Sequence, residues 1–163
     1  MAALEIETLI GACQTVLEGV SGIGRVHDYR REVRNESDAR SLWVVDDTGQ
    51  INAWQVTLGE PAVSSVRHPG FGAIGSSDRG TVLADISLVF EGVMGINDAD
   101  ASEKTFRALT FEIMRTFNGI GRVHADVVQQ DPVQWTRFGY LVLAGIYMVH
   151  FAQLRCRFTG RTF

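Results

Sequence analysis

The sequence predicts an α+β fold in which two helices pack on one face of a mostly antiparallel or mixed β-sheet. Two observations carry this prediction. Apolar residues recur at helical spacing in two stretches, 2–19 and about 98–117, and strand-like runs occupy most of the remainder. The predicted order is α-β-β-β-α-β-β-β. No linker or shift in composition divides the 163 residues, so we expect a single domain over 1–163.

The first predicted helix covers residues 2–19. Its apolar residues follow the i, i+3, i+4, i+7 pattern of an amphipathic helix, and they are Ile6, Leu9, Ile10, Cys13, Val16, Leu17 and Val20. Gly19, Gly22 and Gly24 are expected to end it, because glycine takes the left-handed conformation that helix C-termini often need. A strand is expected at 25–33, followed by a charged stretch, RREVRNESDAR, that we interpret as a solvated loop.

The middle of the chain is predicted to be mostly strand. Residues 42–45 and 51–58 are expected to be strands joined by a turn over 46–49, in which Gly49 takes a positive φ. The glycine-rich segment 68–80 lacks periodicity and is expected to be a long loop. Residues 81–94 alternate with period two and form the clearest strand, with Ala84, Ile86, Leu88 and Phe90 on one face.

The second predicted helix begins near Asn97 and Asp98, which are favourable N-cap residues. It runs to about Phe117, and its apolar stripe consists of Phe106, Leu109, Ile113 and Phe117. Three further strands are expected at 122–129, 135–143 and 146–158.

A short internal similarity links the two helix ends. Residues 21–27 (SGIGRVH) and 118–124 (NGIGRVH) share six of seven residues, and each follows a predicted helix. One interpretation is a pair of equivalent contact points or an ancient duplication. The other is that two helix-to-strand turns make the same demand on φ and ψ, which the same glycines meet.

Charge and cysteine content exclude several classes of protein. The net charge is −4, which argues against a protein whose main task is to grip nucleic acid through its phosphates. Two cysteines, Cys13 and Cys156, are too few for a disulfide framework and fit a reducing compartment. The N-terminal residues lack the basic region of a secretory signal, and the apolar run 140–152 is too short to span a membrane. We therefore expect a soluble protein.

Motifs for catalysis, metal binding and cofactor binding are not found in the sequence. The glycines at 19, 22 and 24 follow a helix, whereas a dinucleotide-binding glycine loop follows a strand. No GxxxxGK[ST], HxxxH, HExxH or GxSxG pattern occurs, and residues near 97–109 lack the glycine and the last glutamate of a calcium loop. We therefore expect a protein that is not an enzyme and has no cofactor or metal.

Arginine usage and exposed apolar residues favour a role in protein contacts. Fourteen of the 15 basic residues are arginine, which is enriched at interfaces, although a GC-rich genome would have the same effect. Phe111 and Met114 lie off the centre of the second helix's stripe, and Phe71 and Ile74 lie in the glycine-rich loop. Apolar side chains that are exposed at these positions would need a partner.

Three segments of the chain resemble one family. They are GVSGIGRVHDY at 19–29, INAWQVT at 51–57, and FEGVMGI at 90–96 leading into the helix that starts with DADASE. Together with the order of the elements over residues 4–158, they resemble the tail terminator, or tail completion, proteins encoded among the head–tail joining genes of long-tailed bacteriophages. The family has no catalytic residues to transfer to this chain.

The resemblance implies a structural protein of the virion that folds in the host cytoplasm. Tail terminators form a six-membered ring on the last ring of the tail tube, stop its polymerisation and offer the other face to the neck or head-completion proteins. The expected partners are thus other copies of the chain, the tail tube protein and a stopper or connector protein. Viral DNA would pass through the lumen without sequence-specific binding, which a net charge of −4 allows.

Ring closure requires two different faces on each subunit. We expect Phe111 and Met114 to lie on one of them, and the loop 68–80, with Phe71, Ile74 and Arg79, to order on docking. Other neck and head-completion proteins are the nearest alternative. A small-molecule-binding α+β domain, with a pocket lined by Trp43, Trp54 and Trp135, is the alternative from a different class.

Overall fold

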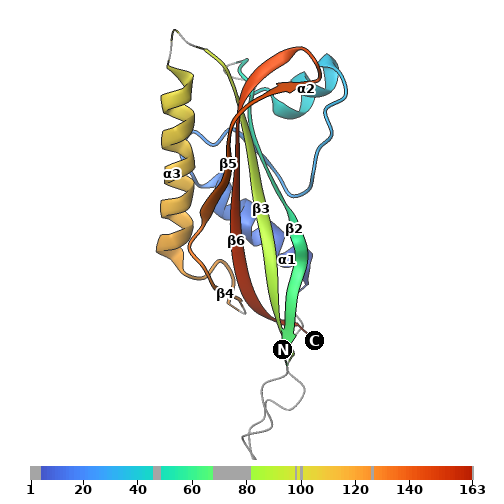
Figure 1. The fold of residues 1–163 in the computed structure, drawn as a ribbon, viewed down its shortest axis with the longest axis vertical. Helices are drawn as coiled ribbons and strands as arrows, with labels where there is room; N and C mark the ends of the chain where they lie inside the picture. The colour runs from blue at the N-terminus through green and yellow to red at the C-terminus, as the bar shows by residue number, and fades with distance from the viewer. Residues whose placement is uncertain are drawn as a thin grey trace, which may run out of the picture.

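The computed structural model describes residues 5–45, 49–67, 82–97, 99, 101–125 and 127–162. Over these residues the α+β class is confirmed, with three helices and a curled, mixed sheet of six strands (Figure 1). In chain order the elements are α1 (Ile6–Glu18), β1 (Arg25–His27), α2 (Glu36–Trp43), β2 (Asn52–Arg67), β3 (Val82–Gly95), α3 (Ser102–Ile120), β4 (Val127–Gln129), β5 (Gln134–Leu143) and β6 (Tyr147–Thr162).

The sheet is built around three long strands, β2, β3 and β6, which run side by side (Figure 1). The β2–β3 and β3–β6 pairs are antiparallel, whereas β1 is parallel to β2. β4 and β5 both pair with β6, β4 at residues 158–160 and β5 at residues 147–155. The described sheet therefore ends in β1 and β2 on one side and in β5 and β4 on the other.

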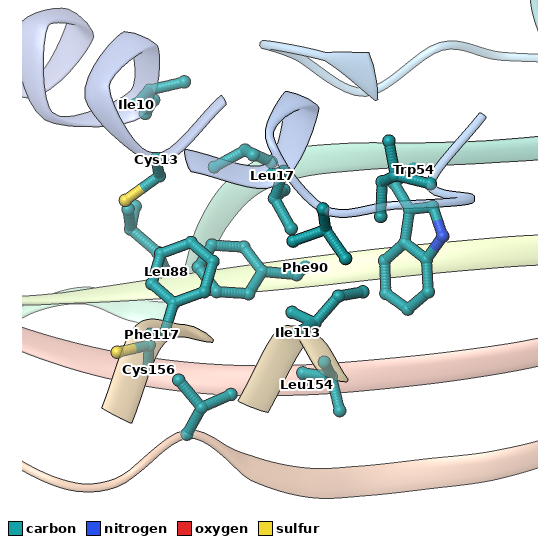
Figure 2. Close-up of a cluster of buried hydrophobic side chains, with 14 of the residues drawn as sticks. Ile10, Cys13, Leu17, Trp54, Leu88, Phe90, Ile113, Phe117, Leu154 and Cys156 are labelled. Carbon is teal, nitrogen blue, oxygen red and sulfur yellow. The ribbon is translucent and has the colours of Figure 1, made fainter. Parts of the chain in front are cut away.

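The main core lies between one face of the sheet and the helices α1 and α3. The alternating residues of β3 that were predicted to share a face, 84, 86, 88 and 90, are all buried in it. Figure 2 shows side chains of α1, such as Cys13 and Leu17, pointing toward Leu88 and Phe90 of β3, with Phe117 of α3 beside them. The Phe90 and Phe117 rings lie 4.8 Å apart between centroids. Burial of these apolar side chains is the main force that fixes both helices.

The opposite face of the sheet has a smaller core, which sequence reasoning did not anticipate. Ala39 and Trp43 of α2 pack there against Ala53, Val93 and Val149, which alternate with residues of the main core. The prediction of helices on one face only is therefore wrong, because α2 covers part of the other face.

The structure of residues 30–45 differs from two of the predictions. They were expected to be a charged loop and a strand at 42–45, but 36–43 form helix α2, and Val44 makes only an isolated bridge to Ile51. The Asn35 side chain caps the helix by accepting a hydrogen bond from the Asp38 backbone N–H at 2.9 Å. Glu36 and Arg40 pair across one turn at 2.8 Å. The observed element order is thus α-β-α-β-β-α-β-β-β.

The start of the second predicted helix also differs. Asn97 does not cap it, because α3 begins at Ser102, and its N-cap residue Ala101 has a φ of 50° and no side-chain cap. The Asn97 backbone N–H instead donates to the Ser102 hydroxyl at 2.8 Å. The stripe 106, 109, 113 and 117 is buried as predicted.

The two related heptapeptides have different structures. Residues 22 and 24 have positive φ angles of 79° and 74° and lead directly into β1. In the second copy, residue 119 is still helical and only Gly121, with a φ of 67°, has a positive value. Ile23 is buried, whereas its counterpart Ile120 is exposed. The interpretation that both segments need the same backbone conformation therefore holds for the second glycine of each copy, Gly24 and Gly121, and fails for the first.

Several strand bounds differ from those predicted. The run expected at 25–33 is a strand only over 25–27, and the run expected at 122–129 only over 127–129. The strand at 51–58 extends to Arg67, passing through Pro61 and two register shifts. The positive φ predicted at Gly49 is confirmed, at 64°. The predicted loop 68–80 lies outside the described residues.

Candidate functional site

The predicted contact residues fall in different settings. Phe71, Ile74 and Arg79 lie outside the described residues. Phe111 is 53% exposed on α3, which is unusual for a large aromatic side chain. Met114 is half-buried and packs against the main core, so it contributes less to the outer surface than the sequence suggested.

An apolar surface runs from Phe111 along the face of β5, and we call it the β5 stripe. It consists of Phe111, Trp135, Phe138, Tyr140, Val142 and Met148, whose exposed fractions run from 38% to 62%. Its aromatic rings form a connected row, with centroid distances of 4.7 Å from Phe111 to Trp135 and 5.6 Å from Trp135 to Phe138. Aromatic side chains and methionine are enriched in this way at protein interfaces.

A β-bulge places the whole row on one face. The pairing of β5 with β6 shifts between Trp135 and Arg137, which leaves Thr136 without a direct partner. Trp135 and Phe138 are three residues apart, and without the bulge they would point to opposite faces. The Thr136 hydroxyl donates to the Gln153 carbonyl at 3.1 Å, which fixes the bulged residue.

The backbone edge of β5 is unpaired in the described part of the chain. β5 pairs with β6 alone, and α3 contacts β5 through side chains, Phe111 with Trp135 and Glu103 with Tyr140. Residues 138–143 (FGYLVL) contain no charge and no proline, and they pair with 147–152 without a bulge. Natural edge strands usually carry charged residues, proline or bulges, which hinder pairing with another chain. The outer edge of β2 has this protection, in Pro61 and two register shifts.

Polar contacts hold the stripe against the start of α3. The Tyr140 hydroxyl donates to the Glu103 carboxylate at 2.9 Å, and Arg107 pairs with the same carboxylate. These hydrogen bonds, first that of Tyr140 and then that of Arg107, lower the pKa of Glu103 below its ordinary value. The buried His150 Nε2 lies 2.8 Å from the Ser102 hydroxyl oxygen and joins β6 to α3.

The Ser102–His150 pair has the composition of a catalytic dyad but not its setting. Both residues are buried, and the Ser102 oxygen also accepts the Asn97 backbone N–H. A nucleophile needs access to a substrate. The His150 ring also stacks on Phe106 and contacts Tyr140, with ring centroids at 5.9 and 5.2 Å. We interpret the pair as a structural link that the sequence could not reveal.

A second buried polar group lies on the other face of the sheet. Both oxygens of Glu91 accept hydrogen bonds at 2.9 Å, one from the Gln55 amide and the other from the Gln153 amide. Arg30 reaches the same carboxylate at 3.3 Å. The three residues lie side by side on β2, β3 and β6, so this network ties the strands together.

The remaining candidates for chemistry do not form a site. Over the described residues, no three His, Cys, Asp or Glu side chains lie where they could hold a metal. Cys13 and Cys156 are free and buried, and burial raises the pKa of both thiols, that of Cys156 to about 12. Their thiolates, the reactive form of cysteine, are therefore disfavoured.

The predicted tryptophan pocket is wrong. Trp54 is buried in the main core, Trp43 packs in the smaller core on the other face, and Trp135 belongs to the β5 stripe. The gap between Trp43 and Trp54 has no room for a water molecule. These residues lie on different faces and elements of the sheet, which the positions of the tryptophans in the sequence do not reveal.

Comparisons with known proteins give no family. No family model matches the chain, and no curated protein is significantly similar to it. Of the helices that the structure describes, none combines the length and the apolar character needed to cross a membrane. The functional argument therefore rests on the resemblance in the sequence and on the surfaces described above.

Proposed function

We propose that this chain is a structural protein of a bacteriophage virion, a tail terminator that closes into a six-membered ring at the end of the tail tube. The observation that carries the proposal is the β5 edge with its stripe, an unprotected strand edge beside exposed aromatic side chains. Such an edge is a surface for association with another chain. The neck proteins of the same virion are the nearest alternative role.

The stripe supports association through its composition and its support. It offers four aromatic side chains that already make ring contacts: Phe111 with Trp135, Phe138 with the buried Phe106, and Tyr140 with the buried His150. Little side-chain entropy is therefore lost when a partner covers them. The bulge at Thr136 and the link from Tyr140 to Glu103 hold the row in one plane. In a ring this surface is one half of a contact whose other half is a different surface of the next subunit.

The distribution of charge supports a ring through which DNA passes. Among the described residues, several arginines form ion pairs with carboxylates, including Arg30–Glu91, Arg40–Glu36 and Arg157–Asp131. Guanidinium groups that are already paired contribute less to phosphate binding, and a net charge of −4 weakens it further. A lumen of this kind would let DNA slide.

The contact is tested by sedimentation of the wild-type chain over a concentration series, with Val142→Lys as the disrupting variant. Val142 is 59% exposed, so a lysine there protects the edge without entering the core. We expect Val142→Lys to weaken association at least about tenfold, or roughly 1.4 kcal/mol. Leu58→Lys is the matched control, because Leu58 is an exposed apolar residue on β2, and it should leave association unchanged.

Two results would count against this proposal. If Val142→Lys and Leu58→Lys associate equally well, the β5 stripe is not the contact. If the wild-type chain associates with connector or neck proteins and never with tail tubes, the alternative role within the neck is the right one.

A further inference from the structure

A polar groove lies on the sheet face opposite α1 and α3, away from the β5 stripe. It has a volume of about 340 Å³ and is lined by β2, β3, β5, β6 and the segment before β5. The lining residues that matter for its chemistry are Glu60, Ser87, Asp131, Gln134, Arg155 and Arg157. We call it the β6 groove, because Arg155 and Arg157 of β6 form one side of it.

Ser87 provides a polar group at the bottom of the β6 groove. It is only 4% exposed and pairs in register with Arg157, and in the described part of the chain its hydroxyl has no hydrogen-bond partner. A methyl group at Gly59 would lie 2.5 Å from the Ser87 hydroxyl oxygen, so glycine at 59 lets β2 pass close beside it. The Ser87 hydroxyl lines the groove and can therefore donate a hydrogen bond to a group that binds there.

The charges of the groove leave one guanidinium available. Arg157 pairs with Asp131 at 2.9 Å. Arg155 lies two residues before Arg157 on the same strand and the same face, and no carboxylate among the described residues pairs with it. Gln134, directly opposite Arg155 on β5, has a free side-chain amide in the same part of the structure.

We propose that the β6 groove binds a carboxylate group, with Arg155 as its ion partner and Ser87 as a hydrogen-bond donor. Arginine presents two parallel N–H groups that match the two oxygens of a carboxylate. The Arg157–Asp131 ion pair, with one nitrogen–oxygen distance of 2.9 Å, shows that a carboxylate is already held by an arginine in the same groove. The source of the carboxylate is either a polypeptide, through an acidic side chain, or a small organic acid.

A phosphate fits the groove less well than a carboxylate. The four charged groups of the lining, Arg155, Arg157, Glu60 and Asp131, sum to zero. A carboxylate adds one negative charge, whereas a phosphate at neutral pH adds more, next to two carboxylates that would repel it. The groove is therefore suited to a single monoanionic group.

The test is a titration of the ¹⁵N-labelled full chain, followed by NMR, with N-acetyl-glutamate N-methylamide. Its uncharged counterpart, N-acetyl-glutamine N-methylamide, has the same shape and is the control ligand. We expect saturable shifts of the Ser87 and Arg155 amides with the charged probe, at millimolar concentrations, and at least tenfold weaker binding of the uncharged one. Arg155→Gln should weaken binding about tenfold, and Ser87→Ala by a smaller factor.

Arg137→Gln is the matched control variant, because Arg137 lies on the same face, over the Phe151 ring, and does not line the groove. It should leave binding unchanged. The proposal is overturned if wild-type and Arg155→Gln chains bind the charged probe with equal affinity. It is also overturned if the probe gives no saturable shift up to about 50 mM, a concentration beyond the millimolar range expected for the site. Tighter binding of inorganic phosphate than of the charged probe would overturn it as well. Titration with glutarate separates the sources: tighter binding of the blocked glutamate indicates a polypeptide, and tighter binding of glutarate indicates a free organic acid.

Discussion

Gly92 and Trp54 lie in close contact in the main core, and replacing the glycine tests the packing directly. The two residues are paired in register on β3 and β2, and the indole ring of Trp54 lies over Gly92. A methyl group at position 92 would be 2.4–2.5 Å from three atoms of that ring. Trp54 is 1% exposed and packs against Phe106 at 5.9 Å between ring centroids, so it has little room to move.

The expected cost of Gly92→Ala follows from two opposing terms. Forcing an extra methyl into a packed core costs about 1–3 kcal/mol. The lower flexibility of alanine in the unfolded chain offsets about 0.5–1 kcal/mol. We therefore expect a net loss of up to about 2.5 kcal/mol, centred near about 1.3 kcal/mol, in the free energy of unfolding, measured by urea denaturation with an unchanged m-value.

Gly139→Ala is the matched control for this prediction. Gly139 lies in β5, a methyl group there would meet nothing within 4 Å, and the variant should be neutral or more stable by about 0.5–1 kcal/mol. The double variant Gly92→Ala/Trp54→Phe should lose less than the sum of its parts, because the smaller ring relieves the clash. If Gly92→Ala is as stable as Gly139→Ala, the contact between β3 and Trp54 is not as described.

Three further predictions concern buried polar groups. Glu91→Ala should lower the free energy of unfolding by about 2–4 kcal/mol in chemical denaturation, because the buried Gln55 amide, the half-buried Gln153 amide and Arg30 lose their acceptor. An effect below about 0.5 kcal/mol would refute the network. Ser102→Ala should cost about 1–2 kcal/mol by the same assay, since it removes the hydroxyl that pairs with His150 Nε2, and a neutral result would show that the link is not stabilising. The thiols of Cys13 and Cys156 should resist a disulfide reagent at pH 8 in the native chain and react fully in urea. Because folding raises their pKa values, the stability they contribute is present below the unfolded pKa of about 8.5 and is lost as pH rises toward the folded-state values, about 12 for Cys156.

Elements with a strong apolar pattern were predictable from the sequence. The helix stripes around Leu9 and Ile113 and the alternation of Ile86 and Leu88 all lie in the main core. In these segments local periodicity and tertiary burial agree, so pattern alone places the core face.

Helix α2 was not predictable in the same way. It has eight residues, and its only buried side chains are Ala39 and Trp43. The Asn35 cap and the Glu36–Arg40 pair are visible in the sequence, but they stand in a charged run that has no periodicity. A short helix of this kind depends on tertiary packing, here against the second face of the sheet.

The candidate surfaces were only partly visible in the sequence. Phe111 could be identified because it departs from the stripe of its own helix, and it is exposed. Phe138 and Val142 read as ordinary strand residues, because their exposure depends on β5 being an edge strand and on the bulge at Thr136. The β6 groove joins Ser87 to Arg155, 68 positions away in number, and only the β3–β6 register brings them together.

Assembly at the end of a tail tube is the central claim, and native mass spectrometry with negative-stain imaging tests it most directly. The chain is analysed alone and after mixing with tail tubes of the same phage. We predict a closed ring with a central hole, in which six chains of 18.0 kDa give 108 kDa, either in free solution or at the tube end. A strict monomer at every concentration that also fails to bind the tubes would contradict the proposed function.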